Sequence, residues 1–273
     1  MKALEKLLIK NEELKFVCVG LDTDINKIPK HLLTKENPIL EFNRKIIEAT
    51  EQYAAAYKIN FAFYEALGKK GFEIIEESLK MIPGNIITIA DAKRGDIGNT
   101  SEMYAKSVYE HFGFDSITLH PYMGKDSLQP FLNYSDKLNF ILTLTSNPGS
   151  SDFEKQILLD GSFLYQKIID SVSRWNKEKN CGIVFGATNT EELQSNINSF
   201  ADLSVLLPGV GAQGGSFEDV LEVFFNNKRK NFIVNISRGI IYLSSEDDFY
   251  FRAEQEIRKL NEIAKRIFSA KDY

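Results

Sequence analysis

Cysteine, tryptophan and histidine are scarce in this sequence. The 273 residues include two cysteines, one tryptophan and three histidines. Cys18 and Cys181 both lie in apolar runs and are far apart in the chain. Two buried, reduced thiols are therefore a better interpretation than a disulfide or a cysteine metal site.

Long apolar runs and an excess of positive charge are also missing. No stretch approaches the roughly 20 apolar residues of a membrane span, and residues 1–6 contain neither a long apolar core nor a cleavage site. Lys and Arg total 33 against 38 Asp and Glu, a net charge of −5 at pH 7. This balance disfavours nucleic acid as a partner. We therefore expect a cytoplasmic protein that binds neither nucleic acid nor a membrane.

The rest of the composition is that of an ordinary globular protein, with 43% hydrophobic and 26% charged residues. Apolar runs typical of buried strands alternate with apolar positions at helical spacing. The strand candidates are 16–21, 54–59, 86–90, 116–119, 140–144, 183–185, 205–207 and 232–236. The clearest helical patterns lie at 39–49, 74–82, 103–112, 164–175 and 249–268, and a short opening helix carries Leu4, Leu7 and Leu8.

This alternation predicts an α/β fold with a parallel sheet. Eight such units in a chain of this length favour a closed (β/α)8 TIM barrel, which typically takes about 250 residues. We predict a single barrel domain over residues 1–273, since no linker or repeat interrupts the pattern. Polar residues also follow the strands directly, where barrel enzymes build their active sites. These are Asp22, Lys58, Asp91, Lys93, Ser146 and Arg238.

The most informative stretch is 86–100, which reads IITIADAKRGDIGNT. Its first half is β-branched and apolar, as in a buried strand. Because side chains alternate along a strand, Asp91 and Lys93 are expected to point the same way, with Asp96 on the turn that follows. A surface salt-bridge cluster is the alternative. Charges that directly follow a buried strand favour a functional site instead.

A second motif, PGVGAQGG at 208–215, follows a strand and precedes a helix. Glycine backbone N–H groups and a helix N-terminus both favour an anion. A nicotinamide site would need an acidic residue at the end of the next strand. That strand instead ends in Arg238, which can hold a phosphate with two parallel hydrogen bonds. Barrels commonly bind phosphate at these last two loops.

These motifs resemble those of the orotidine 5′-phosphate decarboxylases, especially the bacterial subgroup with longer loops. The resemblance covers most of the chain, including 19–22, 57–60, 91–100, 207–215 and 235–240. It implies cofactor-independent decarboxylation of orotidine 5′-phosphate to uridine 5′-phosphate, the last step of de novo UMP synthesis. It also implies a homodimer with shared active sites.

The resemblance assigns the catalytic roles to charged residues. Lys93 would be the proton donor, Asp91 would lie against the substrate carboxylate, and Asp96 would come from the partner subunit. Lys58 and Asp22 would hold ribose hydroxyls and complete the charge network.

The remaining implied contacts bind the substrate. Ile97 would lie beside the base and Thr100 near the ribose. Gln213 and Arg238 would hold the phosphate, and Ser146 would contact the pyrimidine, although the adjacent Thr145 could serve instead. The other implied substrate-binding residues are Asn60, Pro208 and Gly215.

The chemistry agrees with this assignment. Loss of CO₂ from C6 of a pyrimidine leaves a carbanion with no adjacent electron sink, and the sequence has no pyridoxal or thiamine motif. The protein must then supply electrostatic stabilisation and a proton. Lys93 between Asp91 and Asp96 is expected to stay protonated, so it can act both as a cation and as an acid. Enzymes lower barriers by up to about 23 kcal/mol, so we expect no cofactor and no metal.

Other functions remain open. A ribulose-phosphate epimerase would need a metal and histidines at strand ends, where only His120 is suitably placed. A related aldose-phosphate lyase shares Asp-x-Lys-x-x-Asp but needs a divalent metal. A catalytically silent phosphate-binding protein is a further alternative. The segment 150–161 matches no part of the family pattern, so its role also stays open.

Overall fold

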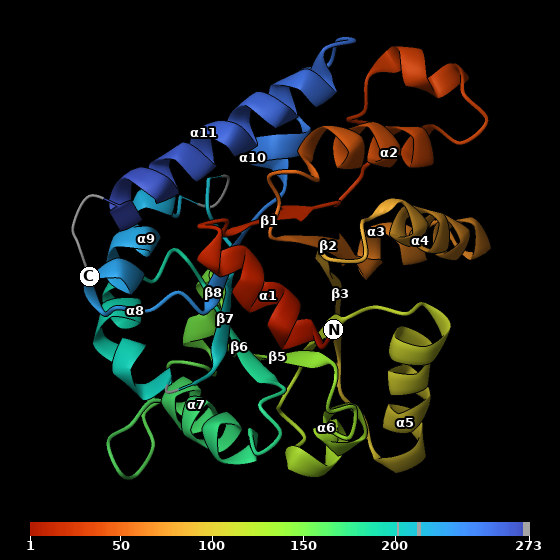
Figure 1. The fold of residues 1–273 in the computed structure, drawn as a ribbon. Helices are drawn as coiled ribbons and strands as arrows, with labels where there is room; N and C mark the ends of the chain where they lie inside the picture. Colours follow the sequence, from red (N-terminus) through yellow and green to blue (C-terminus); the bar gives the residue numbers. More distant parts are fainter. Residues whose placement is uncertain (201, 212–213, 270–273) are drawn as a thin grey trace.

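The computed structural model describes residues 1–200, 202–211 and 214–269. Its centre is a closed barrel of eight parallel strands, in which each strand pairs with the next and β8 pairs with β1 (Figure 1). The predicted (β/α)8 barrel is therefore confirmed. The strands are β1 Val17–Gly20, β2 Ala56–Asn60, β3 Ile87–Arg94, β4 Ser116–Leu119, β5 Leu138–Leu144, β6 Cys181–Phe185, β7 Ser204–Leu207 and β8 Phe232–Ile236.

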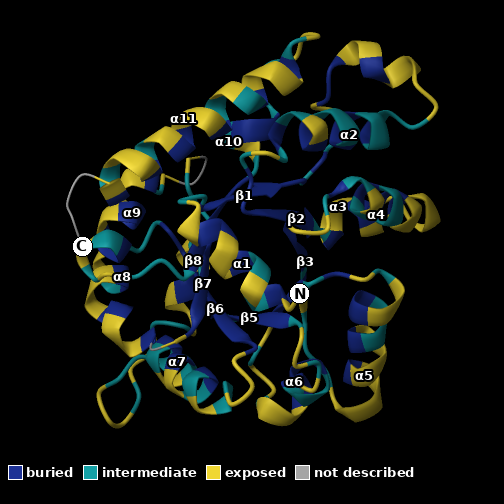
Figure 2. Cartoon of the chain, viewed as in Figure 1, coloured by how far each residue is buried: buried dark blue, intermediate teal, exposed yellow. Residues whose placement is uncertain are grey.

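Helices surround the barrel, with their buried faces toward the strands and their exposed faces outward (Figure 2). The α-helices are α1 Ala3–Glu12, α2 Pro38–Thr50, α3 Phe61–Glu65, α4 Lys69–Met81, α5 Gly98–Lys106, α6 Lys125–Leu132, α7 Leu164–Trp175, α8 Thr190–Asn196, α9 Phe217–Asn226, α10 Arg238–Ile241 and α11 Phe249–Ser269. Short 3₁₀ turns lie at η1 Lys30–Thr34, η3 Pro148–Ser151 and η4 Ile197–Phe200, and a π-helical turn at η2 Ser107–His111.

The local sequence explains these elements. All four residues of β1 are buried, as expected for a parallel strand covered on both faces. In α7 the buried positions Tyr165, Ile169 and Val172 recur at helical spacing and face the core. The N-cap of α2 is Asn37, whose side chain accepts a hydrogen bond from the Leu40 N–H at 3.3 Å. The boundaries of α7 match the predicted range 164–175.

The α1 helix closes the amino ends of the strands. Its first N–H, that of Ala3, donates to the Asp136 carbonyl just before β5 at 2.9 Å. The side chain of Asn11 donates to the Phe232 carbonyl, the first of β8, at 3.0 Å. Behind α1 the barrel interior is filled by buried apolar side chains, including Cys18, Ile87, Ile89, Phe140, Val184, Leu206 and Ile233. A substrate must therefore bind at the opposite, carboxyl end.

Two predicted helices differ in detail. Leu8 was expected on the buried face of α1 but is 40% exposed, because the helix buries Ala3 and Leu7 against the barrel end. The helix predicted at 103–112 begins earlier, at Gly98, and ends in the π-helical turn η2. The polar start of α5 has no apolar periodicity, so the sequence pattern placed its first turn too late.

The structure also shows the state of the two cysteines and the character of the helices. Cys18 and Cys181 are both buried and unpaired, as predicted, and burial raises the pKa of each thiol to about 12. Within the described parts of the chain, no helix is both long and apolar enough to span a bilayer.

Candidate active site

The end of β3 is irregular and carries the central pair of charges. The pairing of β3 with β4 shifts register between Ala90 and Arg94, and Lys93 has a left-handed backbone with φ of 47°. Simple alternation was therefore the wrong reason to expect Asp91 and Lys93 together. They do converge, because the Lys93 Nζ lies 2.6 Å from the Asp91 Oδ1. The Thr118 hydroxyl accepts from the Lys93 N–H at 3.1 Å and donates to Asp91 at 3.0 Å.

Lys58 extends this pair into a chain of alternating charges. Its Nζ lies 2.8 Å from the Asp91 Oδ2 and 3.5 Å from the Asp22 Oδ1. The order is thus Asp22, Lys58, Asp91, Lys93, with an opposite charge beside each member. The Lys58 side chain is 4% exposed, whereas that of Lys93 is 50% exposed. Lys93 is therefore the more accessible of the two lysines in this chain of charges.

The neighbouring charges keep the buried groups ionised. Burial alone would raise the pKa of Asp91, but Lys58 and Lys93 outweigh burial and hold that pKa well below its usual range. Burial alone would lower the pKa of Lys58, but Asp91 and Asp22 outweigh it and raise that pKa. The site therefore presents fixed charges at neutral pH, which is the requirement for electrostatic catalysis.

These charges line a cavity of about 300 Å³ at the carboxyl ends of the strands. Apolar side chains from three strands, Leu142, Val184 and Leu206, also line it. One wall is thus polar and charged, and another is suited to the flat face of an aromatic ring. The predicted site residues that line the cavity are Asp22, Lys58, Asn60, Asp91, Lys93, Ser146, Pro208 and Arg238.

Three predicted residues lie outside the cavity, on the turn between β3 and α5. The Asp96 carboxylate accepts a hydrogen bond from the Ile97 N–H at 2.7 Å. The Ile97 side chain is 67% exposed, and Thr100 is exposed in the first turn of α5. None of the three is among the residues that line the cavity of its own chain.

The predicted phosphate loop is only partly at the cavity. Gly209 and Val210 line it, whereas Gly215 does not. The Gly215 N–H donates to the Gly209 carbonyl at 3.1 Å, and a Cβ at Gly215 would lie 2.9 Å from that oxygen. Gly215 therefore shapes the loop by allowing this close approach. Gln213 lies outside the described residues.

The two candidate hydroxyl groups for contact with a ligand follow β5. Thr145 and Ser146 both line the cavity. The Thr145 hydroxyl is within hydrogen-bonding distance of Glu154, at 2.9 Å, and of Asn147, at 2.7 Å. These contacts tie the Thr145 hydroxyl to Glu154 and Asn147.

Sequence reasoning missed several polar residues of the cavity, notably Thr118 and Asn235. The Asn235 Oδ1 is buried without a hydrogen-bond partner, and its amide donates to the Ser237 hydroxyl at 3.4 Å. Gly20 makes room for this end of β8, since a Cβ there would lie 2.0 Å from the Ser237 hydroxyl. The available signal was a polar residue inside an otherwise apolar strand, as in β4 and β8.

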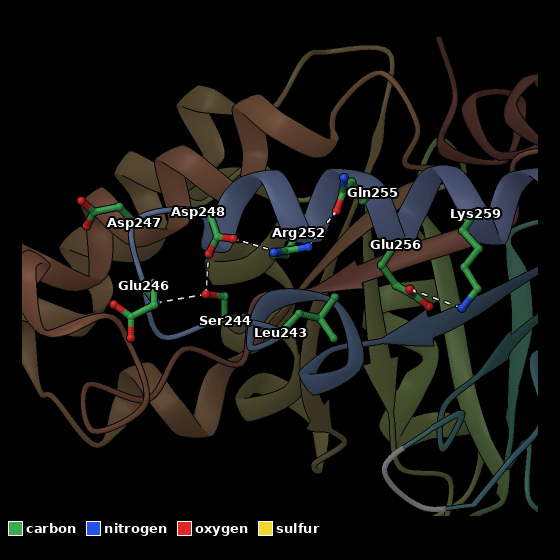
Figure 3. A pocket seen from close by; sticks show the side chains of 9 residues that line it. All are labelled: Leu243, Ser244, Glu246, Asp247, Asp248, Arg252, Gln255, Glu256 and Lys259. Carbon is green, nitrogen blue, oxygen red and sulfur yellow. Dashed lines mark hydrogen bonds and ion pairs between the residues drawn. The ribbon is translucent and has the colours of Figure 1, made fainter.

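A larger hollow of about 890 Å³ lies between the segment 243–248 and α11 (Figure 3). Four of its charged side chains form two pairs: Arg252 lies 2.8 Å from Asp248, and Lys259 lies 3.6 Å from Glu256. None of its lining residues is buried. Exposed pairs of this kind are screened by water, so this hollow lacks the oriented charges of the cavity.

The rival reactions would need metal ligands. In the part of the chain that the structure describes, no three His, Cys, Asp or Glu side chains form a group that could hold a metal ion. His120, the histidine at a strand end, accepts a hydrogen bond from the Tyr122 N–H at 3.2 Å through its Nδ1. The Asp22 and Asp91 carboxylates flank the Lys58 ammonium instead.

Together, the fold and the cavity define a (β/α)8-barrel enzyme whose site is lined by charges of both signs. The family model for the orotidine 5′-phosphate decarboxylase / HUMPS family matches residues 15–247. The chain therefore belongs to this family.

Individual proteins agree with the family model. Over 253 residues the chain is 47% identical to the orotidine 5′-phosphate decarboxylase of Dehalococcoides mccartyi strain CBDB1, covering 91% of this chain and 92% of that protein. It is 46% identical over 258 residues to the protein of the same name from Porphyromonas gingivalis strain ATCC 33277, covering 92% and 93%. The solved structure of Leishmania donovani OMP decarboxylase superposes with a TM-score of 0.81 at 33% identity, covering 97% of this chain and 99% of that one.

Proposed function

We propose that Lys58, Asp91 and Lys93, completed by Asp96 from a second copy of the chain, are the catalytic group of an orotidine 5′-phosphate decarboxylase that needs no cofactor or metal. Asp22 completes the alternating charges and binds the substrate. The chain converts orotidine 5′-phosphate to uridine 5′-phosphate, the last step of de novo UMP synthesis, and is thus a carboxy-lyase. The observation that carries the catalytic assignment is the contact of Lys93 with Asp91 at the accessible end of the buried charge chain.

In the proposed reaction the C6 carboxylate lies against Asp91 and next to Lys93. When the bond between C6 and the carboxyl carbon breaks, CO₂ leaves and the electron pair stays on C6. The Lys93 ammonium stabilises this carbanion and then gives it a proton, which forms uridine 5′-phosphate. Lys93 regains its proton from water, so one proton is consumed for each CO₂ released.

The remaining cavity residues bind and orient the substrate. Asp22 and Lys58 hold the ribose hydroxyls, with Asn60 beside them, and Ser146 contacts the pyrimidine. Arg238 holds the phosphate at the loop that includes Pro208 and Gly209. Binding energy from this remote phosphate can be used at the reacting carbon.

The turn between β3 and α5 completes the site of a second copy in this proposal. Asp96, Ile97 and Thr100 lie outside the cavity of their own chain. Two apolar residues of this region, Ile97 and Met103, are 67% and 54% exposed. A homodimer would bury these side chains and bring Asp96 beside the partner's lysine. We expect this homodimer to act in the cytoplasm.

Turnover in the presence of a chelator tests the proposal. Purified protein in EDTA is expected to consume orotidine 5′-phosphate, and the reaction is measured by the decrease in the absorbance of this substrate. An enzyme that loses its activity on chelation and regains it when a divalent metal is added would instead match the aldose-phosphate lyase mechanism. Binding of the nucleotide without turnover would identify a silent phosphate-binding protein.

A further inference from the structure

The segment 150–161, which the family pattern left unassigned, is folded against the end of β5. Ile157 and Phe163 form an isolated antiparallel bridge, and the Tyr165 N–H donates to the Glu154 carbonyl at 2.9 Å. The segment is therefore held to the start of α7. This places the side chains of its middle residues beside the strand end that lines the cavity.

Glu154 binds the last residues of β5 from this segment. Its Oε2 accepts a hydrogen bond from the Thr145 backbone N–H at 2.7 Å, and its Oε1 lies 2.9 Å from the Thr145 hydroxyl. One carboxylate thus holds both the main chain and the side chain of Thr145. Hydrogen bonds to an ionised group are among the stronger ones in proteins.

The next residue of the segment, Lys155, is linked to the carbonyl group of Thr145 through Asn189. Lys155 pairs with Glu192 of α8, and its Nζ lies 3.5 Å from the Asn189 Oδ1. The Asn189 amide in turn donates to the Thr145 carbonyl at 3.1 Å. Both peptide groups of Thr145 are therefore fixed by side chains tied to residues 154 and 155.

Fixing Thr145 also fixes the residue that follows it. The Thr145 carbonyl carbon forms the peptide bond to the Ser146 nitrogen, and both residues line the cavity. On the β6 side there is no spare room, since a Cβ at Gly186 would lie 2.8 Å from the Ser146 nitrogen. We propose that Glu154 is a positioning residue that orients Ser146 for contact with the pyrimidine. This inference rests on the proposed function, which places the base at Ser146.

Ligand binding with and without the base tests this role. The probes are uridine 5′-phosphate and ribose 5-phosphate, whose phosphate and sugar groups are shared while only the first has a pyrimidine. Glu154→Ala is expected to weaken uridine 5′-phosphate binding about tenfold and to leave ribose 5-phosphate binding unchanged. Glu154→Gln keeps one acceptor and the same shape, so its loss should be smaller. The matched control is Asp152→Asn, which removes an exposed charge from the same segment and should change neither affinity.

A double-mutant cycle with Ser146→Ala shows whether Glu154 acts through Ser146. If it does, adding Glu154→Ala to Ser146→Ala costs no further affinity for uridine 5′-phosphate. Additive losses, or equal losses for both probes, would overturn the proposal. Should Glu154→Ala fail to fold, Glu154→Gln carries the same comparison, with ribose 5-phosphate binding as its check on folding. A wild-type protein that does not turn over orotidine 5′-phosphate would refute the proposed function instead.

Discussion

The two halves of the stretch 86–100 differ sharply although only a few residues separate them. In the first half, Asp91 and Lys93 lie in the cavity and belong to a chain of alternating charges. In the second half, the half-buried Asp96 and the exposed Ile97 lie on a turn outside that cavity. Two aspartates of one motif thus differ in their neighbours, because only Asp91 lies between two lysines in its own chain. Burial between two lysines, and not residue type, is what gives Asp91 its fixed charge.

This contrast implies a division of labour. The inner half, with Asp91 and Lys93, belongs to the site of its own chain. In the proposal above, the outer half, with Asp96 and Ile97, completes the site of a second copy. Variants in each half, and one at the far end of the cavity, test whether the two halves have these different roles.

The largest effect is expected for Lys93→Ala in the inner half. Turnover should fall by about 10⁴-fold or more, because both the stabilising cation and the proton donor are lost. Binding of uridine 5′-phosphate should persist, since the phosphate and sugar contacts remain. Steady-state kinetics and a binding titration measure the two effects. A fall in kcat of less than tenfold would remove Lys93 from the chemical step.

Asp96→Ala tests the outer half. Alone, it should be nearly as inactive as Lys93→Ala. Mixing the two inactive proteins should restore roughly a quarter of native activity, because about half of the dimers are mixed and each mixed dimer has one intact site. Different tags on the two proteins establish that subunits have exchanged. Exchange without recovered activity would place Asp96 in the site of its own chain.

Arg238→Ala separates binding from chemistry at the other end of the cavity. Loss of a charge-assisted grip on phosphate should raise KM by about 10- to 100-fold, with a smaller fall in kcat. Inorganic phosphate should also protect the variant less well against heat than it protects the wild type. The reverse pattern, a fall in kcat with KM preserved, would contradict the role of Arg238.

The last pair of variants, which includes the smallest expected effect, concerns stability. The pKa of Asp91 is lower in the folded than in the unfolded protein, so the unfolded chain binds more protons in acid. The contribution of Asp91 is therefore complete above its unfolded value of about 4 and is lost as the pH falls further below it. Asp91→Asn should flatten this acid-induced loss and cost about 3 kcal/mol at neutral pH. Asp96→Asn should change the free energy of unfolding by less than about 0.5 kcal/mol. Denaturant titrations at several pH values measure the free energy of unfolding of both variants. If this free energy depended on pH in the same way in both, the difference between Asp91 and Asp96 would be refuted.

The strands and most helices could be predicted because burial dictates their patterns. Phe232–Ile236 is apolar enough to be assigned as β8 without other information, and α7 shows its helical period clearly. That the chain is a single domain stays a prediction.

The finer geometry of the site could not be predicted. A left-handed lysine at position 93 has no sequence signature, and the contacts of the Thr118 hydroxyl with Lys93 and Asp91 occur where the register of β3 and β4 shifts. The hold of Glu154 on Thr145 joins residues nine apart through a loop whose path has no periodic pattern.

The backbone of Lys93 has a consequence for directed evolution. Among the described residues, Lys93 is the one non-glycine residue with a left-handed backbone inside a strand, since Leu14, Lys179 and Lys228 lie in turns. That conformation costs a side-chain-bearing residue of order 1 kcal/mol. Glycine at this position would relieve the cost, but it would also remove the ion pair with Asp91 and the proposed proton donor. A library screened for heat resistance alone would therefore weigh this backbone cost only against the ion pair of Lys93 with Asp91, and only a screen that also scores turnover would select for the lysine as an acid.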